Sequence, residues 1–198
     1  MHSSEPRLGA AVALCMLAGC RTAPPSFPAA PPWEVRRLEL QALEHFELRG
    51  RVAVATGREG FNANLRWVQQ GAHSQLTLEG PLGAGAVQVS ASENQLDIVA
   101  ANGVRTDSDA ARAELRARLG FDPPLKSLRY WILGVPDPAR PATEALDEAH
   151  RHLQGLTQDG WHIDYTQYSA VVAQWLPTRM TLQRDTVRVR VLVDDWQP

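Results

Sequence analysis

The sequence predicts a mainly β protein, an antiparallel sheet that curls toward a sandwich or barrel with two helices across its open face. Between residues 48 and 193, several segments alternate apolar with polar residues, as strands with one buried face do. Glycine-rich turn signals separate the earlier segments at short spacing. Two helical patterns stand between the first and the last set of strands, where they would cover the sheet.

The first element after the N-terminal region is expected to be a helix over residues 33–47. Apolar residues recur there at roughly helical spacing among Glu, Arg and Gln; they are Trp33, Leu38, Leu40, Leu43 and Phe46. From Leu48 onward the period changes to two. Strands are expected around residues 61–67, 75–79, 87–89 and 187–193. Turns are expected at residues 56–60, 70–71, 80–83, 93–94 and 102–103.

The middle of the chain interrupts the alternation with two helical segments. Residues 107–109 are good helix caps, and the Ala-, Arg-, Glu- and Leu-rich run that follows predicts a helix over residues 110–119, ending at Gly120. A second helix is expected over residues 125–133, with Leu125, Leu128, Trp131 and Ile132 on one face. A proline-rich loop at 137–141 follows, and strands resume at 153–158, 161–168 and 179–183.

The N-terminus has the features of a lipoprotein leader. An apolar run at residues 8–17 is too short to span a bilayer and suits a secretory signal. It ends in Leu17-Ala18-Gly19-Cys20, which resembles the lipobox of bacterial lipoprotein precursors. That resemblance implies removal of residues 1–19 and acylation of Cys20; the alternative is a signal peptide in which Cys20 has no such role. Residues 20–32 are proline-rich and predict a stiff tether, leaving residues 33–198 as one domain.

Composition narrows the classes of function. The net charge is −2 and stays there without the leader, which holds one Arg and one Glu, so we expect no nucleic-acid partner. Cys15 leaves with the leader and Cys20 would carry lipid, so the mature domain has no cysteine for a disulfide or a thiolate zinc site. In lipobox families an aspartate after the cysteine retains the protein in the inner membrane. Arg21 stands there instead, which favours the outer membrane.

No motif of a hydrolase, phosphate-binding loop or zinc protease stands out, so we expect no enzyme, cofactor or metal. His150 and His152 would share a strand face, but without a third ligand they are interpreted as solvated surface residues. The Asp194-Asp195 pair is interpreted as a charged strand end. Four tryptophans on separate elements, Trp67, Trp131, Trp161 and Trp175, fit either a Trp-rich core or a ligand cavity.

Several segments together resemble the LolB family of outer-membrane lipoprotein receptors. The matching stretches lie at residues 46–51, 61–67, 80–83, 124–134 and 158–161. The helical Pro-Leu…Trp-Ile-Leu-Gly stretch and the Gly80-Pro81-Leu82-Gly83 loop are the most specific. The resemblance implies an unclosed antiparallel β-barrel of about eleven strands, with helices forming a lid over an apolar cavity.

The resemblance also implies a mechanism. Family members accept lipoproteins from the soluble periplasmic carrier LolA, bind their acyl chains, and insert them into the outer membrane without nucleotide. On this basis we expect a monomer on the periplasmic face of the outer membrane, anchored through Cys20. A loop of Pro81, Leu82 and Gly83 would contact membrane lipid. The residues expected to line the acyl-chain cavity are Phe61, Leu65, Trp67, Leu76, Leu78, Val87, Val89, Trp131, Ile132 and Val189.

Three other functions stay open on the residues alone. An anchored binder of another amphiphile, such as a phospholipid or glycolipid, would share the cavity but not exchange cargo with the carrier. A structural lipoprotein would have a solidly packed interior. An esterase would need a nucleophile and base, which the sequence does not offer at a recognisable spacing.

Overall fold

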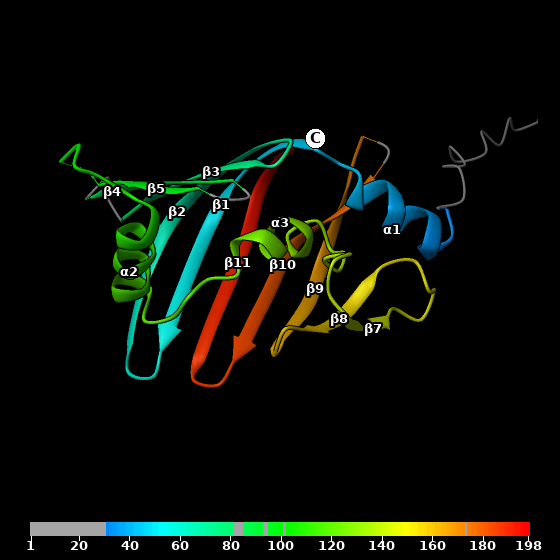
Figure 1. The fold of residues 1–198 in the computed structure, drawn as a ribbon. Helices are drawn as coiled ribbons and strands as arrows, with labels where there is room; N and C mark the ends of the chain where they lie inside the picture. The colour runs from blue at the N-terminus through cyan, green and yellow to red at the C-terminus, as the bar shows by residue number, and fades with distance from the viewer. Residues whose placement is uncertain (1–30, 81–84, 93–94, 101, 173) are drawn as a thin grey trace, which may run out of the picture.

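The computed structural model describes residues 31–80, 85–92, 95–100, 102–172 and 174–198. Within these ranges, eleven strands form one antiparallel sheet in the order β6-β5-β4-β3-β2-β1-β11-β10-β9-β8-β7, which curves but does not close, because β6 and β7 stand at its two ends (Figure 1). The strands are β1 (His45–Thr56), β2 (Glu59–Gln70), β3 (His73–Glu79), β4 (Ala86–Ala91), β5 (Leu96–Val99), β6 (Arg105–Asp107), β7 (Ala142–Leu146), β8 (Leu153–Gln158), β9 (Trp161–Val171), β10 (Gln174–Arg184) and β11 (Val187–Gln197). The predicted fold class is confirmed.

The sheet is built from two runs of sequential strands joined at its centre. Neighbours in the sheet are neighbours in the chain everywhere except at β1 and β11, the first and last strands. There Val52 lies opposite Val191 and Val54 opposite Val189, after a bulge between Arg49 and Gly50. This pairing brings the two ends of the domain together and makes one continuous apolar face from both halves.

In the part of the chain that the structure describes, three helices accompany the sheet: α1 (Trp33–Gln41), α2 (Ser108–Leu119) and α3 (Leu125–Trp131). Figure 1 shows α2 and α3 in front of the hollow face of the sheet and α1 beside β9. Helix α2 ends as predicted at Gly120, whose φ of 77° is the left-handed conformation that favours glycine, and its N–H donates to the Arg116 carbonyl at 2.8 Å. Among the described helices, none is long and apolar enough to cross a membrane.

The structure corrects the predicted extent of the first helix. Helix α1 ends at Gln41, and Phe46 belongs to β1 rather than to the helix. Phe46 fits both periods, since it lies three residues after Leu43 and two before Leu48. Its aromatic neighbours decide the outcome: the Phe46 ring packs 5.9 Å from the Trp67 ring on β2 and 5.7 Å from the Trp196 ring on β11.

The predicted strands are confirmed in position, but the short strands β5, β6 and β7 were not predicted and β10 is longer than expected. Edge strand β7 was not predicted, because its residues are mostly polar or small and largely exposed. Strand β10 begins at Gln174, earlier than the expected residue 179, because it accommodates Pro177 next to an irregularity in its pairing with β9. The turns expected at 80–83 and 93–94 fall largely outside the described residues.

Candidate functional site

An apolar cavity of about 110 Å³ lies between the sheet and the helices. All of its lining residues are hydrophobic. From the sheet come Val52, Val54, Phe61, Leu65, Trp67, Leu76, Leu78, Val89, Trp161, Met180, Leu182, Val189 and Val191. From α2, α3 and the segment between them come Leu115, Leu119, Phe121, Pro123, Pro124, Leu125, Leu128, Trp131 and Ile132. Such a lining offers burial to an apolar ligand and no polar group to orient one.

The floor of the cavity follows from the two-residue period of the strands and from their register. Leu65 on β2 lies opposite Leu78 on β3, and Trp67 lies opposite Leu76. Leu76 in turn lies opposite Val89 on β4. Directly opposed residues of antiparallel strands point to the same face, so these pairs form a continuous apolar surface across three strands.

The roof consists of α2, α3 and the link between them. Helix α3 turns Leu128, Trp131 and the following Ile132 toward the sheet. The link carries Phe121, whose ring meets the Trp161 ring edge-on at 5.5 Å. Trp161 also lies 6.3 Å from the Trp131 ring, so aromatic contacts tie the roof to the floor at this end of the cavity.

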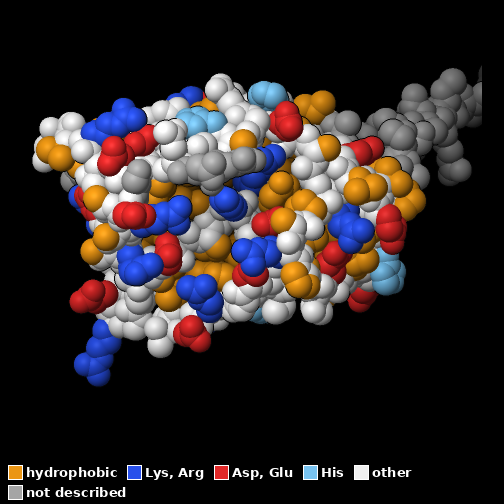
Figure 2. Space-filling model, in the orientation of Figure 1, with side chains coloured by type: hydrophobic (Ala, Val, Ile, Leu, Met, Phe, Trp, Pro, Cys, Tyr) orange, Lys and Arg blue, Asp and Glu red, His pale blue; other side chains and the backbone are white. Residues whose placement is uncertain are grey.

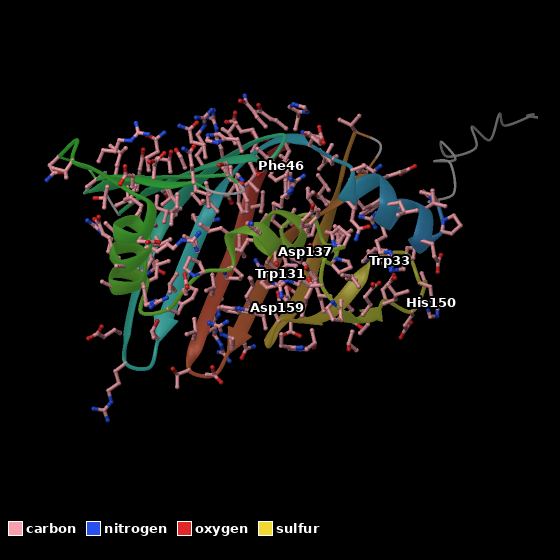
Figure 3. All side chains as sticks on the ribbon, in the orientation of Figure 1. Trp33, Phe46, Trp131, Asp137, His150 and Asp159 are labelled. Carbon is pink, nitrogen blue, oxygen red and sulfur yellow. The ribbon has the colours of Figure 1, made fainter. Side chains whose placement is uncertain are left out.

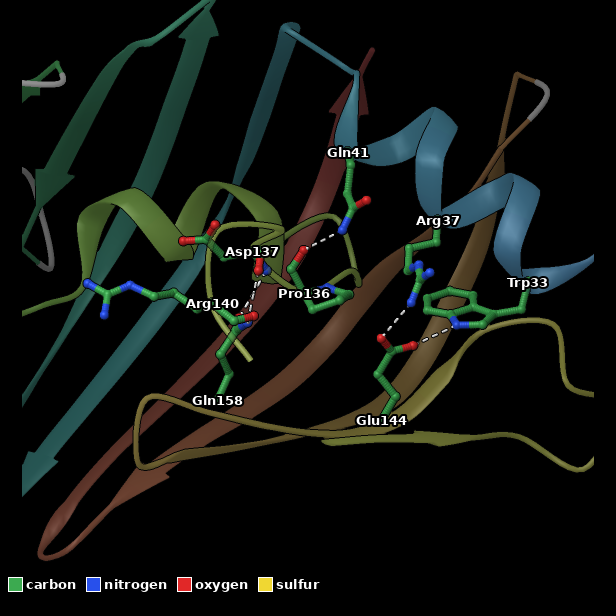
Figure 4. A network of polar contacts seen from close by, with 8 residues as sticks. All are labelled: Trp33, Arg37, Gln41, Pro136, Asp137, Arg140, Glu144 and Gln158. Carbon is green, nitrogen blue, oxygen red and sulfur yellow. Dashed lines mark hydrogen bonds and ion pairs between the residues drawn. The ribbon is translucent and has the colours of Figure 1, made fainter. Parts of the chain in front are cut away.

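A buried polar network fastens α3 to the sheet. The Gln158 side chain, 2% exposed, accepts a hydrogen bond from Trp131 Nε1 at 2.7 Å and one from the Asp137 N–H at 2.9 Å. Its Nε2 donates to the carbonyls of Asp137 at 3.0 Å and Arg140 at 2.9 Å (Figure 4). Ser127 Oγ donates to Asp137 Oδ2 at 2.8 Å. Satisfied networks of this kind hold an element in one place.

A tyrosine completes this fastening. Tyr165 Oη donates to the Trp131 carbonyl at 2.9 Å, close to the end of α3. Burial raises the pKa of the Tyr165 phenol well above its usual value, so the hydroxyl keeps its proton and remains a donor.

Helix α2 is held differently, mainly by apolar packing. Ala111 and Leu115 are buried in a second cluster with Val89, Leu96 and Ile98. At the C-terminal end of the helix, Thr56 Oγ1 donates to the Leu119 carbonyl at 3.1 Å. In the described part of the chain, α2 side chains instead make exposed hydrogen bonds, from Arg116 to Asp122 and from Arg118 to Glu114. The α3 half of the roof is therefore held by buried hydrogen bonds, and the α2 half mainly by apolar packing.

The structure brings together nine of the ten residues expected to line a cavity. They are Phe61, Leu65, Trp67, Leu76, Leu78, Val89, Trp131, Ile132 and Val189. Val87 does not reach the cavity; it packs instead against the second cluster, beside α2. Of the four tryptophans, Trp67, Trp131 and Trp161 line the cavity, whereas Trp175 is 47% exposed.

Sequence reasoning missed more than half of the lining. The β1 and β11 contributions, Val52, Val54 and Val191, and the β10 pair Met180 and Leu182 carry the same two-residue alternation as the residues that were named. That signal was available in the sequence. The contribution of Phe121 and the two prolines in the link was not, because irregular segments carry no period.

Four residues singled out in the sequence lie outside the described residues: Cys20 and the loop residues Pro81, Leu82 and Gly83. Lipidation at Cys20 and membrane contact at the loop therefore stay predictions.

The two histidines do not share a strand face. His150 lies in a turn with a φ of 51° (Figure 3). The His152 ring stacks 4.2 Å from the Tyr168 ring, and burial lowers the pKa of its imidazole although Asp147 stands 3.7 Å away. The described residues contain no group of three or more side chains placed to hold a metal ion. Asp194 and Asp195 do not form the strand end that the sequence suggested, since β11 continues to Gln197; Asp194 pairs with Arg51 at 2.8 Å.

This architecture matches that of a known protein family. The model of the family described as outer membrane lipoprotein LolB matches residues 44–196, nearly the whole sheet together with α2 and α3. The chain belongs to the LolB family. Outer-membrane lipoprotein LolB of Nitrosococcus oceani is 32% identical to it over 94% of both chains. The protein of that name from Pseudomonas aeruginosa LESB58 is 31% identical over 96% of this chain and 94% of its own.

Solved structures support the fold. A LolA superfamily protein from Nitrosomonas europaea superposes with a TM-score of 0.53 at 6% identity, covering 85% of this chain and 94% of its own. A DUF1329 family protein from Desulfovibrio piger superposes with a TM-score of 0.56 at 8% identity, covering 82% and 89%. This LolB family member is thus an outer-membrane lipoprotein with a role in lipoprotein localisation, in a family not known for enzymes.

Proposed function

We propose that this protein, as a monomer, accepts lipoproteins from the carrier LolA by binding their acyl chains in the apolar cavity, and then inserts them into the outer membrane without nucleotide. The observation that carries the proposal is the cavity lining, in which every residue is hydrophobic. The sheet and the roof both contribute to it, so an acyl chain would be covered on two sides.

The driving forces need no chemical step. One long acyl chain costs on the order of 10 kcal/mol to expose to water, at about 0.8 kcal/mol per methylene. Transfer between two apolar cavities avoids that exposure, so a modest difference in affinity between donor and acceptor directs it. Release into the bilayer is downhill, because lipid solvates the chains over their whole length.

The size of the cavity implies that its roof moves. A volume of about 110 Å³ is far less than a long acyl chain fills. The buried network of Gln158 and Trp131 keeps α3 in place, whereas α2 rests on apolar contacts that acyl methylenes can replace. We therefore propose that α2 and the link after it move outward when cargo enters, while α3 stays on the sheet.

A cavity-filling substitution tests the proposal. Val189 lines the cavity from β11 and is partly buried, so Val189→Trp adds an indole to the space that acyl chains would occupy. The expected result is at least a tenfold weaker affinity for a fluorescent fatty-acyl probe, which corresponds to about 1.4 kcal/mol. The measurement is a titration of probe emission with the leaderless Cys20→Ala protein.

The matched control is Arg188→Trp, the neighbouring residue on the opposite, exposed face of the same strand. It adds the same side chain outside the cavity and should leave probe affinity unchanged. Equal affinities of Val189→Trp, Arg188→Trp and the unsubstituted protein, with all three folded, would exclude the cavity as the acyl site.

A further inference from the structure

A corner of the molecule formed by α1 and the tip of the β9–β10 hairpin carries unusual apolar exposure. Of five large hydrophobic side chains that are exposed in the described part of the chain, four lie here. Val35 and Leu38 on α1 are 46% and 63% exposed, and Val172 and Trp175 at the hairpin are 95% and 47% exposed. Single exposed leucines are ordinary on protein surfaces, but a group of four including a tryptophan is not.

Val35 and Leu38 on α1 and Val172 and Trp175 at the end of the hairpin beside it form a region that we name the α1–hairpin corner. Trp175 lies on the opposite face of β10 from Gln174, so the corner presents apolar side chains on both sides of the hairpin end. Val35 and Leu38 are three apart on a helix and therefore share a face. Gln174 Nε2 at the hairpin donates to Glu39 Oε2 on α1 at 3.1 Å, which brings the two elements side by side. Figure 1 shows the adjoining ends of β9 and β10 next to α1, and Figure 2 shows hydrophobic side chains gathered over this part of the molecule.

The backbone at the hairpin tip adds a second observation. Val172 has a φ of 53°, a conformation that β-branched residues rarely adopt. Turn positions with positive φ normally carry Gly, Asn or Asp, and solvent contact normally favours the same polar residues. A valine that is both strained and almost fully exposed gains nothing within the folded chain. Strained backbone of this kind clusters at functional sites such as ligand clamps, which points to a binding partner here.

The position of the corner in the chain identifies that partner. Helix α1 is the first element after the predicted tether, and the thirteen steps from Cys20 to Trp33 span at most about 47 Å at 3.6 Å per residue. The family is one of outer-membrane lipoproteins, so a lipid anchor at Cys20 would keep α1 near the bilayer. A tryptophan beside aliphatic side chains is the composition of a surface that sits at a membrane interface.

We propose that the α1–hairpin corner inserts into the surface of the lipid bilayer that holds the anchor. This contact is separate from the cavity and from the predicted loop at Leu82. The charged side chains around the corner on α1 include the exposed Glu34 and Glu39, and Arg37 is paired with Glu144 at 2.9 Å. The attachment is therefore apolar, and neither anionic lipid nor low salt strengthens it.

The first experiment measures depth in the membrane with single thiol labels. The mature chain has no cysteine besides Cys20, so Val172→Cys or Leu38→Cys provides one free thiol in the lipidated protein. Each variant is labelled with a fluorophore and anchored in vesicles of phosphatidylethanolamine and phosphatidylglycerol, with and without brominated acyl chains. Thr186→Cys, in the β10–β11 turn at the opposite end of β10, is the control. Brominated lipid is expected to quench the labels at 172 and 38 at least twofold more than the label at 186.

The second experiment removes the anchor. The leaderless Cys20→Ala protein is sedimented with the same vesicles, and Leu38→Glu combined with Trp175→Glu should lower its partition about tenfold or more. Thr186→Glu should not change it, and the acyl-probe affinity of the double variant should stay normal, which separates this surface from the cavity. Equal quenching at all three labelled positions would overturn the proposal. So would unchanged partition of the double variant, or loss of a protein dimer rather than of vesicle binding.

Discussion

Replacing Gln158 by leucine tests the claim that a buried polar network fastens α3 over the sheet. Leucine has a similar size but no polar atom, so the change leaves Trp131 Nε1 and the Asp137 N–H without their acceptor. The carbonyls of Asp137 and Arg140 lose their donor at the same time. A buried group left unpaired costs about 1–3 kcal/mol, so the two orphaned donors together cost about 2–6 kcal/mol. We expect a loss of about 4 kcal/mol, a large part of the roughly 5–15 kcal/mol that stabilises an ordinary domain.

The assay is urea denaturation at 25 °C followed by circular dichroism, comparing Gln158→Leu with Gln167→Leu. Gln167 lies on β9 with its side chain exposed, and its substitution should change the free energy of unfolding by no more than about 0.5 kcal/mol. Adding Trp131→Phe to Gln158→Leu removes one of the two orphaned donors. The loss of unfolding free energy in the double variant should therefore be smaller than the sum of the two single losses, by at least about 1 kcal/mol. A loss below about 1 kcal/mol for Gln158→Leu would refute the reasoning.

Three further predictions concern the bulge at Gly50, the imidazole of His152 and the loop that contains Leu82. In the bulge between β1 and β11, a Cβ at Gly50 would lie 2.1 Å from the Leu192 carbonyl oxygen, so Gly50→Ala should cost more than about 2 kcal/mol in urea denaturation. Gly155→Ala, where the nearest atom is 3.6 Å away, should cost far less, and similar losses would contradict the geometry. Burial lowers the pKa of the His152 imidazole below 6.5, so the unfolded chain takes up this proton first as pH falls, and the free energy of unfolding falls with it. Between pH 7 and pH 5, the free energy of unfolding should therefore fall less in His152→Phe than in the unsubstituted protein. An equal fall in both proteins would contradict the prediction. Finally, Leu82→Glu should leave acyl-probe binding intact and impair delivery into liposomes; normal delivery would exclude the loop from that step.

The sheet was predictable because its strands have one buried face and show it as a two-residue period. Trp67 and Leu78 could be assigned to the cavity side from that period alone, and α2 could be assigned from its caps and its terminal Gly120. The period fails where a residue suits two elements, as Phe46 does, and pairing with distant strands then decides. The two-residue period also shows on which face of the sheet a residue lies, but not how far the cavity extends along that face. Val87 was therefore expected to line the cavity, although the cavity ends before it.

The buried polar contacts were the least predictable part of the structure. Nothing local to Gln158 or Asp137 indicates that residues 21 apart meet in a buried network, because such contacts depend on how the α3 segment folds back over β8. The same holds for Val172 and Trp175, which follow the sequence pattern of an ordinary strand end. Their exposure becomes visible only when the hairpin is placed beside α1.

The measurement that tests the central claim most directly is a transfer assay. The leaderless Cys20→Ala protein would be mixed with the carrier LolA preloaded with a lipoprotein, in the absence of ATP, and the cargo on each protein counted after separation. The account predicts that cargo moves onto this protein, and that Val189→Trp slows or prevents the movement while Arg188→Trp does not. Cargo that stays on a carrier shown to be competent with another acceptor would contradict the account, and would favour a binder of a different amphiphile.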